Sequence, residues 1–279
     1  MNDRRTRIAN TVLTVLLIGI TVLFVLPVLI VLMNSFKGQF YISSQPFSFP
    51  SADTFAGFGN YLNGIRKIGF FRAFGYSLWI TAASVAAILL FTSMTAWFLW
   101  KMGRGLGRGL YYLFIFSMVV PFQMVMFTMS KMANLLSLEN PIGIILIYLG
   151  FGAGLSVFLY SGFVRSIPVS LEEAAAIDGC GPVRMFFSVI FPLLRPITTT
   201  VAVLNVMWIW NDYLLPYLVI GSRYKTIPVA VQYLQGGYGS RDMGALMAML
   251  VLAIIPIIVF YAFAQKYIIR GVIAGAVKE

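Results

Sequence analysis

The chain has 279 residues, of which 60% are hydrophobic and 10% are charged, and its mean hydropathy is +0.89. Soluble globular proteins average about 25% charged residues, so the composition indicates an integral membrane protein. Histidine is absent and only nine residues are acidic, which argues against a zinc site, a Ser-His relay or any other metal site. The single cysteine, Cys180, excludes an internal disulfide.

The formal net charge is +11, with 20 Lys and Arg residues. A basic protein of this size can bind nucleic acid, but these charges lie between apolar runs instead of along one face. Orientation in an anionic membrane explains them better, and we expect membrane lipid as a partner and no nucleic acid.

The first predicted span covers residues 11–33, an uncharged run that follows Arg4, Arg5 and Arg7. A basic start before an apolar run can be a signal peptide. This run is too long for one and lacks a cleavage site of small residues. It is therefore predicted to be a transmembrane helix, and Pro27 could kink it.

Five further spans are predicted in chain order at about 73–100, 109–130, 141–164, 196–220 and 243–265. Six spans place both termini on one side of the membrane. The segments on that side carry 12 of the 20 basic residues, which indicates that it is the cytoplasmic side. We therefore expect one all-α transmembrane domain over residues 1–279, with a cytoplasmic loop at 165–195 and a cytoplasmic tail at 266–279.

The loop at 165–195 has the pattern of two helices and a break. Ser170 and Glu173 form a capping-box pattern, three alanines follow, and glycines at 179 and 181 precede Pro182. An apolar stripe at helical spacing comes next: Val183, Phe186, Phe187 and Ile190. Such a rigid hairpin could dock onto a partner protein, or its stripe could be ordinary core; the residues alone leave both interpretations open.

Polar residues are predicted inside or at the end of two spans. The segment from Pro196 to Asn211 has 16 residues, about 24 Å of helix, so Asp212 is expected in the outer part of the membrane. A charge at that depth usually faces protein or a water-filled path. The candidates for a substrate pathway are Gln123, Asn205, Trp208, Asn211 and Asp212. The alternative is an interfacial aromatic belt in which Asp212 reaches water.

The loop resembles the EAA loop of binding-protein-dependent ABC importer permeases. The matching residues are Glu173-Ala174-Ala175, Asp178-Gly179, Phe186, Ile190, Pro192-Leu193 and Pro196. Trp210-Asn211-Asp212 resembles the WND element of the carbohydrate branch, and Ala274 to Lys278 resembles its tail. The similarity covers most of the chain and fits the smaller permease type. Cys180 stands where the family often has Ala, and Tyr213 where it has Phe.

The resemblance implies the fold of a type I ABC importer permease and a role in ATP-driven import of a sugar or oligosaccharide. Contact with the ATPases is implied for residues of the loop: Glu172, Glu173, Ala174, Ala175, Asp178, Gly179, Phe186 and Pro192. The same is implied for three residues of the tail: Arg270, Gly275 and Lys278. Within this set, Phe186 would anchor the hairpin to the subunit's own helices.

The implied partners are a second permease, two ATPase subunits and an extracytoplasmic solute-binding protein. The two permeases are expected to form a heterodimer, and a homodimer is the alternative. No cofactor is expected in this chain; ATP and Mg would be bound by the ATPases. The expected location is the cytoplasmic membrane of a bacterium or archaeon.

The chain is not expected to be an enzyme, because it lacks the G-x-x-x-x-G-K-[ST] phosphate loop. One alternative is a secondary transporter driven by an ion gradient, which would need intramembrane carboxylates or broken helices in paired halves. Asp212 is the only acidic residue within a predicted span. An intramembrane enzyme is a further alternative, but the chain offers few acid/base groups for one.

Overall fold

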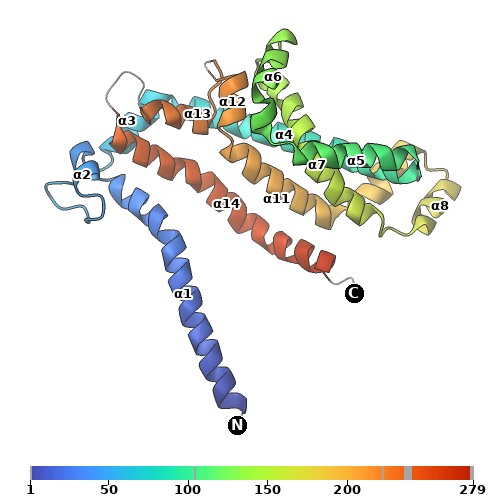
Figure 1. The fold of residues 1–279 in the computed structure, drawn as a ribbon, viewed down its shortest axis with the longest axis horizontal. Helices are drawn as coiled ribbons and strands as arrows, with labels where there is room; N and C mark the ends of the chain where they lie inside the picture. The colour runs from blue at the N-terminus through green and yellow to red at the C-terminus, as the bar shows by residue number, and fades with distance from the viewer. Residues whose placement is uncertain (1, 104, 222, 236–240, 277–279) are drawn as a thin grey trace. The chain divides into compact units, whose positions relative to one another are not determined.

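The computed structural model describes residues 2–103, 105–221, 223–235 and 241–276, without the side chains of 2–5, 7 and 266–276. Within these residues the secondary structure is helical, apart from one isolated bridge between Lys37 and Phe55. The helices in chain order (Figure 1) are α1 (Asn2–Asn34), α2 (Gln39–Ser44), α3 (Gly59–Ile68), α4 (Phe70–Lys101), α5 (Leu106–Val119), α6 (Phe122–Leu135), α7 (Pro141–Val164), α8 (Val169–Ile177), α9 (Pro182–Met185), η1 (Phe186–Ile190), α10 (Phe191–Leu193), α11 (Arg195–Asn211), α12 (Leu214–Val219), α13 (Ile227–Gln232), η2 (Tyr233–Gln235) and α14 (Met243–Ala276).

Four of the described helices are long and apolar enough to cross a membrane: α1, α4, α7 and α14. Two bent pairs pass the same test, α5 with α6 at 101° and the segment Pro182–Leu193 with α11 at 79°, which raises the number of candidate spans to six. The helices therefore account for a multi-pass membrane protein by length and composition.

The bend between α5 and α6 lies inside the stretch 109–130, which the sequence predicts as one continuous helix. Pro121 carries no N–H and its ring disfavours the helical region for the residue before it. Val120 accordingly takes an extended conformation, with φ −77° and ψ 113°, and Pro121 begins α6 as its N-cap. The stretch is thus divided between two helices, α5 and α6, which have 14 residues each and extend beyond it at both ends.

The chain divides into two compact units, and the first comprises residues 1–70 and 230–255. In this unit α3 packs on the start of α14. A Cβ on Gly64 would lie 2.8 Å from the Met249 side chain, and Lys67 and Asn63 both donate hydrogen bonds to the Asp242 carboxylate. Asp242 also accepts from the Ala245 N–H at 2.9 Å, so it caps the start of α14.

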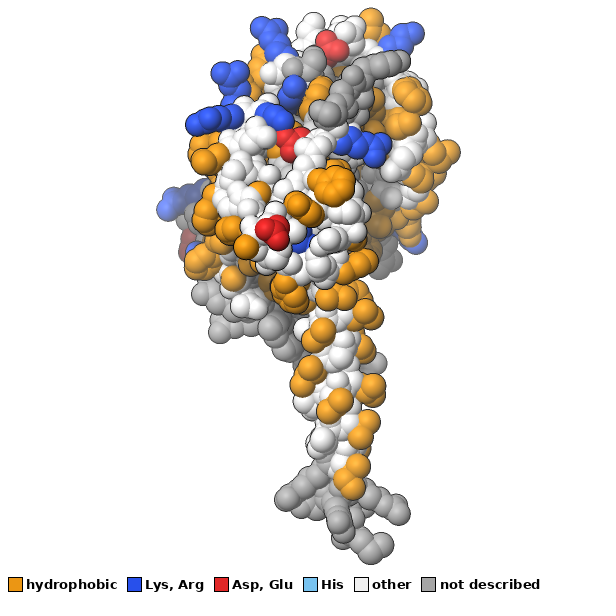
Figure 2. Space-filling model, turned by 90° about the vertical axis from the view of Figure 1, so that its left-hand side faces the viewer, with side chains coloured by type: hydrophobic (Ala, Val, Ile, Leu, Met, Phe, Trp, Pro, Cys, Tyr) orange, Lys and Arg blue, Asp and Glu red, His pale blue; other side chains and the backbone are white. Residues whose placement is uncertain are grey.

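The most apolar part of helix α1, within Ile8–Asn34, is 0% buried. Figure 2 shows apolar side chains along the length of this helix on the face in view. A helix that is apolar all round is suited to contact with lipid or with other membrane helices.

The second unit comprises residues 71–229 and 256–279 and holds the functional candidates. Helices α5 and α11 both pack on α7. Helix α7 begins at Asn140, whose side chain accepts from the backbone N–H groups of Ile142 and Gly143, with Pro141 at the first helical position. Glycine lets α5 approach closely, because a Cβ on Gly154 would lie 2.8 Å from the Phe114 carbonyl oxygen.

Candidate functional site

The loop at 165–195 forms two helical segments with a turn between them. Helix α8 begins two residues earlier than the capping-box pattern predicts: Pro168 is the N-cap, with ψ 130°, and no side chain caps the helix. Ser170 therefore lies within the first turn, and the predicted capping box between Ser170 and Glu173 is wrong. The extended conformation of Pro168 sets the start of this helix instead.

The turn after α8 depends on Gly179. Its φ is +77°, the left-handed region in which an L side chain is strained. The Cys180 N–H donates to the Ala175 carbonyl at 2.9 Å and the Gly179 N–H to the Ala176 carbonyl at 3.0 Å, which is the Schellman pattern. Gly181 and Pro182 then start α9 as N-cap and first residue.

The second segment is not a regular helix. Residues Phe186–Ile190 form a π-helical turn, η1, between α9 and α10. The wider turn changes which side chains share a face, so the predicted stripe is only partly correct. Phe186 and Ile190 are fully buried, whereas Val183 is 66% and Phe187 47% exposed.

One face of the loop packs on helices of its own unit. Ala175, Met185, Phe186 and Ile190 join Trp97 of α4 and Tyr160 of α7 in one apolar cluster. The Trp97 and Phe186 rings lie 5.7 Å apart between centroids. The buried ring of Phe186 thus packs the loop against α4, as expected of an anchor between them.

Glu172 belongs to this inward face as well. Its Oε1 accepts from Trp97 Nε1 at 2.9 Å, and its Oε2 forms a 2.8 Å ion pair with Lys101 Nζ. The Lys101 ammonium also lies 4.5 Å from the centroid of the Trp97 ring. A carboxylate, an indole and an ammonium therefore join the first turns of α8 to the last turns of α4. We call these three residues the Glu172 clamp.

The opposite face of the loop is exposed. Glu173, Ala174, Asp178 and Gly179 are all open to solvent, and Ile177 is 86% exposed. Val169 and Leu171 are exposed as well, and several exposed apolar side chains on one short helix are typical of a surface that a partner covers. Of the predicted loop residues, Glu173, Ala174, Asp178 and Gly179 share this face, Glu172, Ala175 and Phe186 face inward, and Pro192 is half-buried in α10.

Two of the pathway candidates lie at the contact of α7 with α11. Asn205 is 4% exposed, and its Nδ2 donates to Ser156 Oγ at 3.2 Å and to the Val201 carbonyl at 2.8 Å. Trp208 is half-exposed, and its ring lies edge-on to the Tyr148 ring with 5.5 Å between the ring centroids. The bond to Ser156 joins α11 to α7, and the bond to Val201 lies within α11.

Asp212 lies where α11 ends. Tyr148 Oη donates to its Oδ2 at 3.0 Å, and its Oδ1 accepts from the Leu214 and Leu215 N–H groups at 3.0 and 3.4 Å. The carboxylate therefore caps α12 and also joins the Tyr148–Trp208 pair. The predicted span 196–220 is interrupted here, because α11 ends at Asn211 and α12 starts at Leu214.

The remaining candidates stand apart from this cluster. Gln123 is exposed in the first turn of α6 and makes no hydrogen bond with a described residue, and exposed Asn211 donates to the Met207 carbonyl within its own helix. In the tail, Arg270 and Gly275 lie in α14, whose side chains are not described beyond Gln265; Lys278 lies outside the described residues.

The sequence of this chain matches that of a known transporter family. The profile of the binding-protein-dependent transport system inner membrane component covers residues 88–274. The chain belongs to this family. This permease is 39% identical over 279 residues to the probable starch degradation products transport system permease protein AmyC of Thermoanaerobacterium thermosulfurigenes, covering 99% of this chain and 100% of that protein.

A second relative is the multiple sugar-binding transport system permease protein MsmG of Streptococcus mutans, which is 34% identical and covers 92% of this chain and 93% of that protein. The fold matches a chain of the crystal structure of a bacterial ABC transporter involved in the import of the acidic polysaccharide alginate. The TM-score is 0.79 at 24% identity, over 95% of this chain and 98% of that one. The predicted all-α importer-permease fold is confirmed.

Membership of this family makes the permease a membrane-embedded component of a multi-subunit transport system. It gives no support to the gradient-driven alternative. Sequence reasoning missed four residues of the site: Trp97, Lys101, Tyr148 and Ile177. Trp97 and Lys101 lie at the end of the predicted span before the basic turn, and this position is the only sequence signal for a role in the site. Their contacts with Glu172 join residues more than 70 positions apart in the chain, so no local pattern could predict them.

Proposed function

We propose that this permease is one of two permease subunits of an ATP-driven importer of a sugar or oligosaccharide. Support comes from relatives whose names carry starch degradation products and multiple sugars, at 39% and 34% identity. The proposed location is a bacterial or archaeal cytoplasmic membrane, with both termini and the loop 165–195 in the cytoplasm. On this topology, 12 of the 20 basic residues lie on the cytoplasmic side, in the N-terminus, the turn 101–108, the loop and the tail, which supports this orientation.

ATP hydrolysis takes place in two separate ATPase subunits, which bind ATP and Mg. The second permease is a different chain, and a solute-binding protein delivers the sugar from outside. The exposed surface of α1 offers an apolar face for the second permease or for lipid. The C-terminal residues, among them Arg270, Gly275 and Lys278, add a second contact with the ATPases.

One observation carries the coupling role of the loop: it has two faces of different character. The outward face, with Glu173, Ile177 and Gly179, is exposed, whereas the inward face is fixed by Phe186 and the Glu172 clamp. An ATPase that binds the outward face and moves on closing around ATP displaces α8 and, through the clamp, the end of α4. The spans then tilt, and access changes from one side of the membrane to the other.

The sugar path is proposed to run beside the α7–α11 contact. Asp212, Trp208 and Tyr148 combine a carboxylate, an indole and a phenol within one cluster. Carboxylates accept hydrogen bonds from sugar hydroxyls and aromatic faces pack on the apolar faces of sugar rings, which is the usual chemistry of such sites. Asn205 holds the two helices behind that cluster.

Site-specific crosslinking tests this function. In a Cys180→Ser background, Glu173→Cys places a thiol on the outward face and Ala175→Cys places one on the buried face, where Ala175 is 8% exposed. In native membranes the thiol at 173 should crosslink to an ATPase subunit, and the crosslink should change in yield when ATP is added. The matched thiol at 175 should give none.

Two outcomes would contradict the proposal. Labelling of the thiol at 173 by a membrane-impermeant reagent from the outer side alone would place the loop on the wrong side. A sugar uptake that persists after the ATPase subunits are removed would return the gradient-driven mechanism to consideration.

A further inference from the structure

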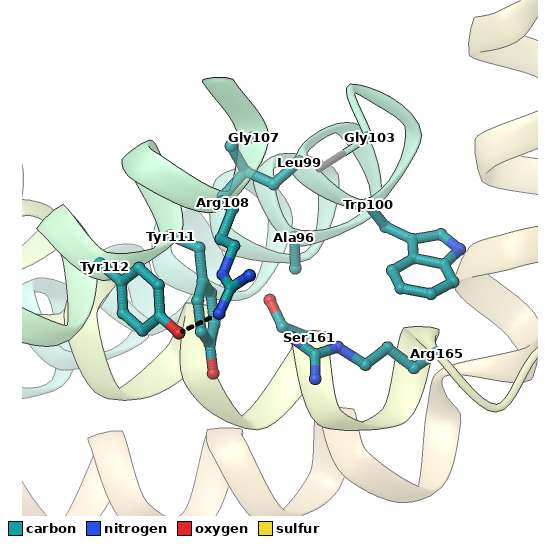
Figure 3. A pocket seen from close by; sticks show the side chains of 10 residues that line it. All are labelled: Ala96, Leu99, Trp100, Gly103, Gly107, Arg108, Tyr111, Tyr112, Ser161 and Arg165. Atoms are coloured by element: carbon teal, nitrogen blue, oxygen red, sulfur yellow. Dashed lines mark hydrogen bonds between the residues drawn. The ribbon is translucent and has the colours of Figure 1, made fainter. Parts of the chain in front are cut away.

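A cavity of about 380 Å³ lies between α4, α5 and α7, at the ends of these helices that adjoin the loop 165–195. Its wall is mostly apolar and aromatic, with Ala96 and Leu99 from α4 and Tyr111 from α5 (Figure 3). Two arginines line it: Arg108 lies in the first turn of α5, and Arg165 is the C-cap residue of α7. We call this cavity the α4–α5–α7 pocket.

Both guanidinium groups rest on aromatic rings. Arg165 Cζ lies 5.5 Å from the centroid of Tyr111 and 6.0 Å from that of Trp100, and Arg108 Cζ lies 5.7 Å from that of Tyr112. Stacking occupies the flat faces of a guanidinium and leaves N–H groups at its edge. Neither arginine forms an ion pair with a carboxylate in the described part of the chain, so two positive charges stand without a counter-ion.

A third polar group completes the pocket. The Oγ of Ser161 is buried, with the residue 6% exposed, and has no hydrogen-bond partner among the described residues. Figure 3 shows this hydroxyl pointing to the side of the pocket where the Arg108 and Arg165 side chains end. A buried hydroxyl without a partner is costly, and such a group usually has a partner that the protein alone does not provide.

Arginine and aromatic residues also mark ordinary membrane interfaces. An interfacial belt, however, needs no cavity and leaves no buried hydroxyl unpaired. Arg108 donates one hydrogen bond, to the Tyr112 hydroxyl at 3.3 Å, and its other N–H groups are left for a ligand. Two guanidinium groups without a carboxylate partner and an unpaired hydroxyl at one apolar cavity match an anion with several acceptor oxygens, of which a phosphate group is the best fit.

We propose that the α4–α5–α7 pocket binds the phosphate group of an anionic phospholipid from the leaflet beside the loop. Arg108 and Arg165 pair with the phosphate oxygens, Ser161 donates its hydroxyl hydrogen, and the apolar wall receives the glycerol and the start of the acyl chains. Basic pockets between membrane helices are suited to such head groups. The assignment of that leaflet as cytoplasmic rests on the proposed function.

The position of the pocket gives the lipid a structural effect. Arg165 is the residue at which α7 passes into the loop, and Arg108 belongs to α5. A phosphate held by both arginines therefore links α5 to the start of the coupling loop. An anionic lipid would stabilise the position of the loop on its helices.

Lipid retention on the whole transporter complex tests the proposal. The complex is placed in nanodiscs of phosphatidylcholine with phosphatidylglycerol as the minor lipid, and bound lipids are counted by native mass spectrometry. An arginine that pairs with the phosphate of the bound lipid contributes about fivefold to its retention, so Arg108→Gln with Arg165→Gln should lower phosphatidylglycerol retention by about 25-fold. Arg195→Gln, an exposed arginine outside the pocket, is the matched control and should leave retention unchanged.

Equal retention in the wild type and the double variant would overturn the proposal. The wild-type complex gives a further test that needs no variant: it must prefer phosphatidylglycerol to phosphatidylcholine, and no preference refutes the site. Glycerol phosphate is added to separate discs of pure phosphatidylcholine. If it binds as tightly as the lipid, the ligand is a soluble phosphate and the lipid source is wrong.

This result is independent of the crosslinking experiment. Lipid preference with no crosslink at residue 173 would leave the pocket in place and refute the coupling role. A crosslink without lipid preference would do the reverse.

Discussion

Reversal of the Glu172–Lys101 ion pair tests whether Glu172 acts inside the permease or on a partner. Its Oε1 accepts from Trp97 and its Oε2 pairs with Lys101, and its side chain is 13% exposed, against 43% for Lys101. The neighbouring Glu173 is exposed. Removal of either carboxylate takes one negative charge from α8, but only removal of the Glu172 carboxylate should release α8 from α4.

The structure sets the size of the effect. A hydrogen bond to a charged acceptor contributes about 1.5–3 kcal/mol, and a half-exposed ion pair at most about 1 kcal/mol. Glu172→Ala should therefore weaken the attachment of α8 by about 2–3 kcal/mol, roughly 30- to 150-fold in the equilibrium. Glu172→Gln keeps an acceptor for the Trp97 indole and should cost about 1 kcal/mol.

Hydrogen exchange of the α8 amides in the purified complex measures this attachment directly, and sugar uptake per ATP hydrolysed in proteoliposomes measures its consequence. Glu172→Ala should speed exchange and lower uptake per ATP. Glu173→Gln should leave the exchange rates as they are. The exchanged pair, Lys101→Glu with Glu172→Lys, should recover part of the lost protection because opposite charges again face each other.

The reasoning fails if Glu172→Ala leaves the exchange of α8 unchanged. It also fails if Glu173→Gln speeds exchange as much as Glu172→Ala does. If Lys101→Glu with Glu172→Lys restores the hydrogen-exchange rates of the α8 amides but abolishes uptake, Glu172 acts on a partner.

Gly179→Ala forces an L side chain into φ +77° and should cost about 1–2 kcal/mol, which lowers uptake while the complex still assembles; an equally active Gly179→Ala transporter would refute this. Gly154→Val should separate α5 from α7 at a cost of about 1–3 kcal/mol and lower the unfolding temperature of the complex, whereas Gly150→Val, with open space at its Cβ, should not. Burial raises the pKa of Asp242, but hydrogen bonds from Lys67, the Ala245 N–H and Asn63, with the Lys67 charge, hold it below its ordinary value. The stabilisation that the ionised Asp242 gives is therefore present above pH about 4 and is lost as the pH falls through the lowered pKa. Thermal unfolding measured at pH 5 and at pH 3 should show that the wild type loses more stability than Asp242→Asn over this range, by under about 1 kcal/mol.

The helical membrane fold follows from the sequence because long uncharged runs leave the backbone few alternatives in lipid. The breaks are harder to predict. Pro121 lies in a run as apolar as its neighbours, and hydropathy cannot tell a kink from a bend of 101°. The π-helical turn at Phe186–Ile190 likewise has more residues per turn than an α-helix, so α-helical spacing cannot predict which of its side chains are buried.

The loop shows the same division. A motif places Glu172 and Glu173 side by side as if they were equivalent, yet the structure turns one inward and leaves the other exposed. The difference depends on Trp97 and Lys101, which lie more than 70 residues away in the chain. The Schellman turn at Gly179, in contrast, depends on local conformation and was expected from the glycine.

The π-helical turn also affects how the chain can change in length. A residue added to a regular helix rotates everything beyond it by about 100°, and a π turn is the form in which a helix absorbs such an insertion. Deletion of one residue between Phe186 and Ile190 would therefore remove the wide turn and leave the segments on either side in register. A second deletion would find no wide turn to absorb it and would rotate the following helix by about 100°, so that Asn205 would leave Ser156. A single deletion inside this turn should thus be tolerated, whereas a second one should not.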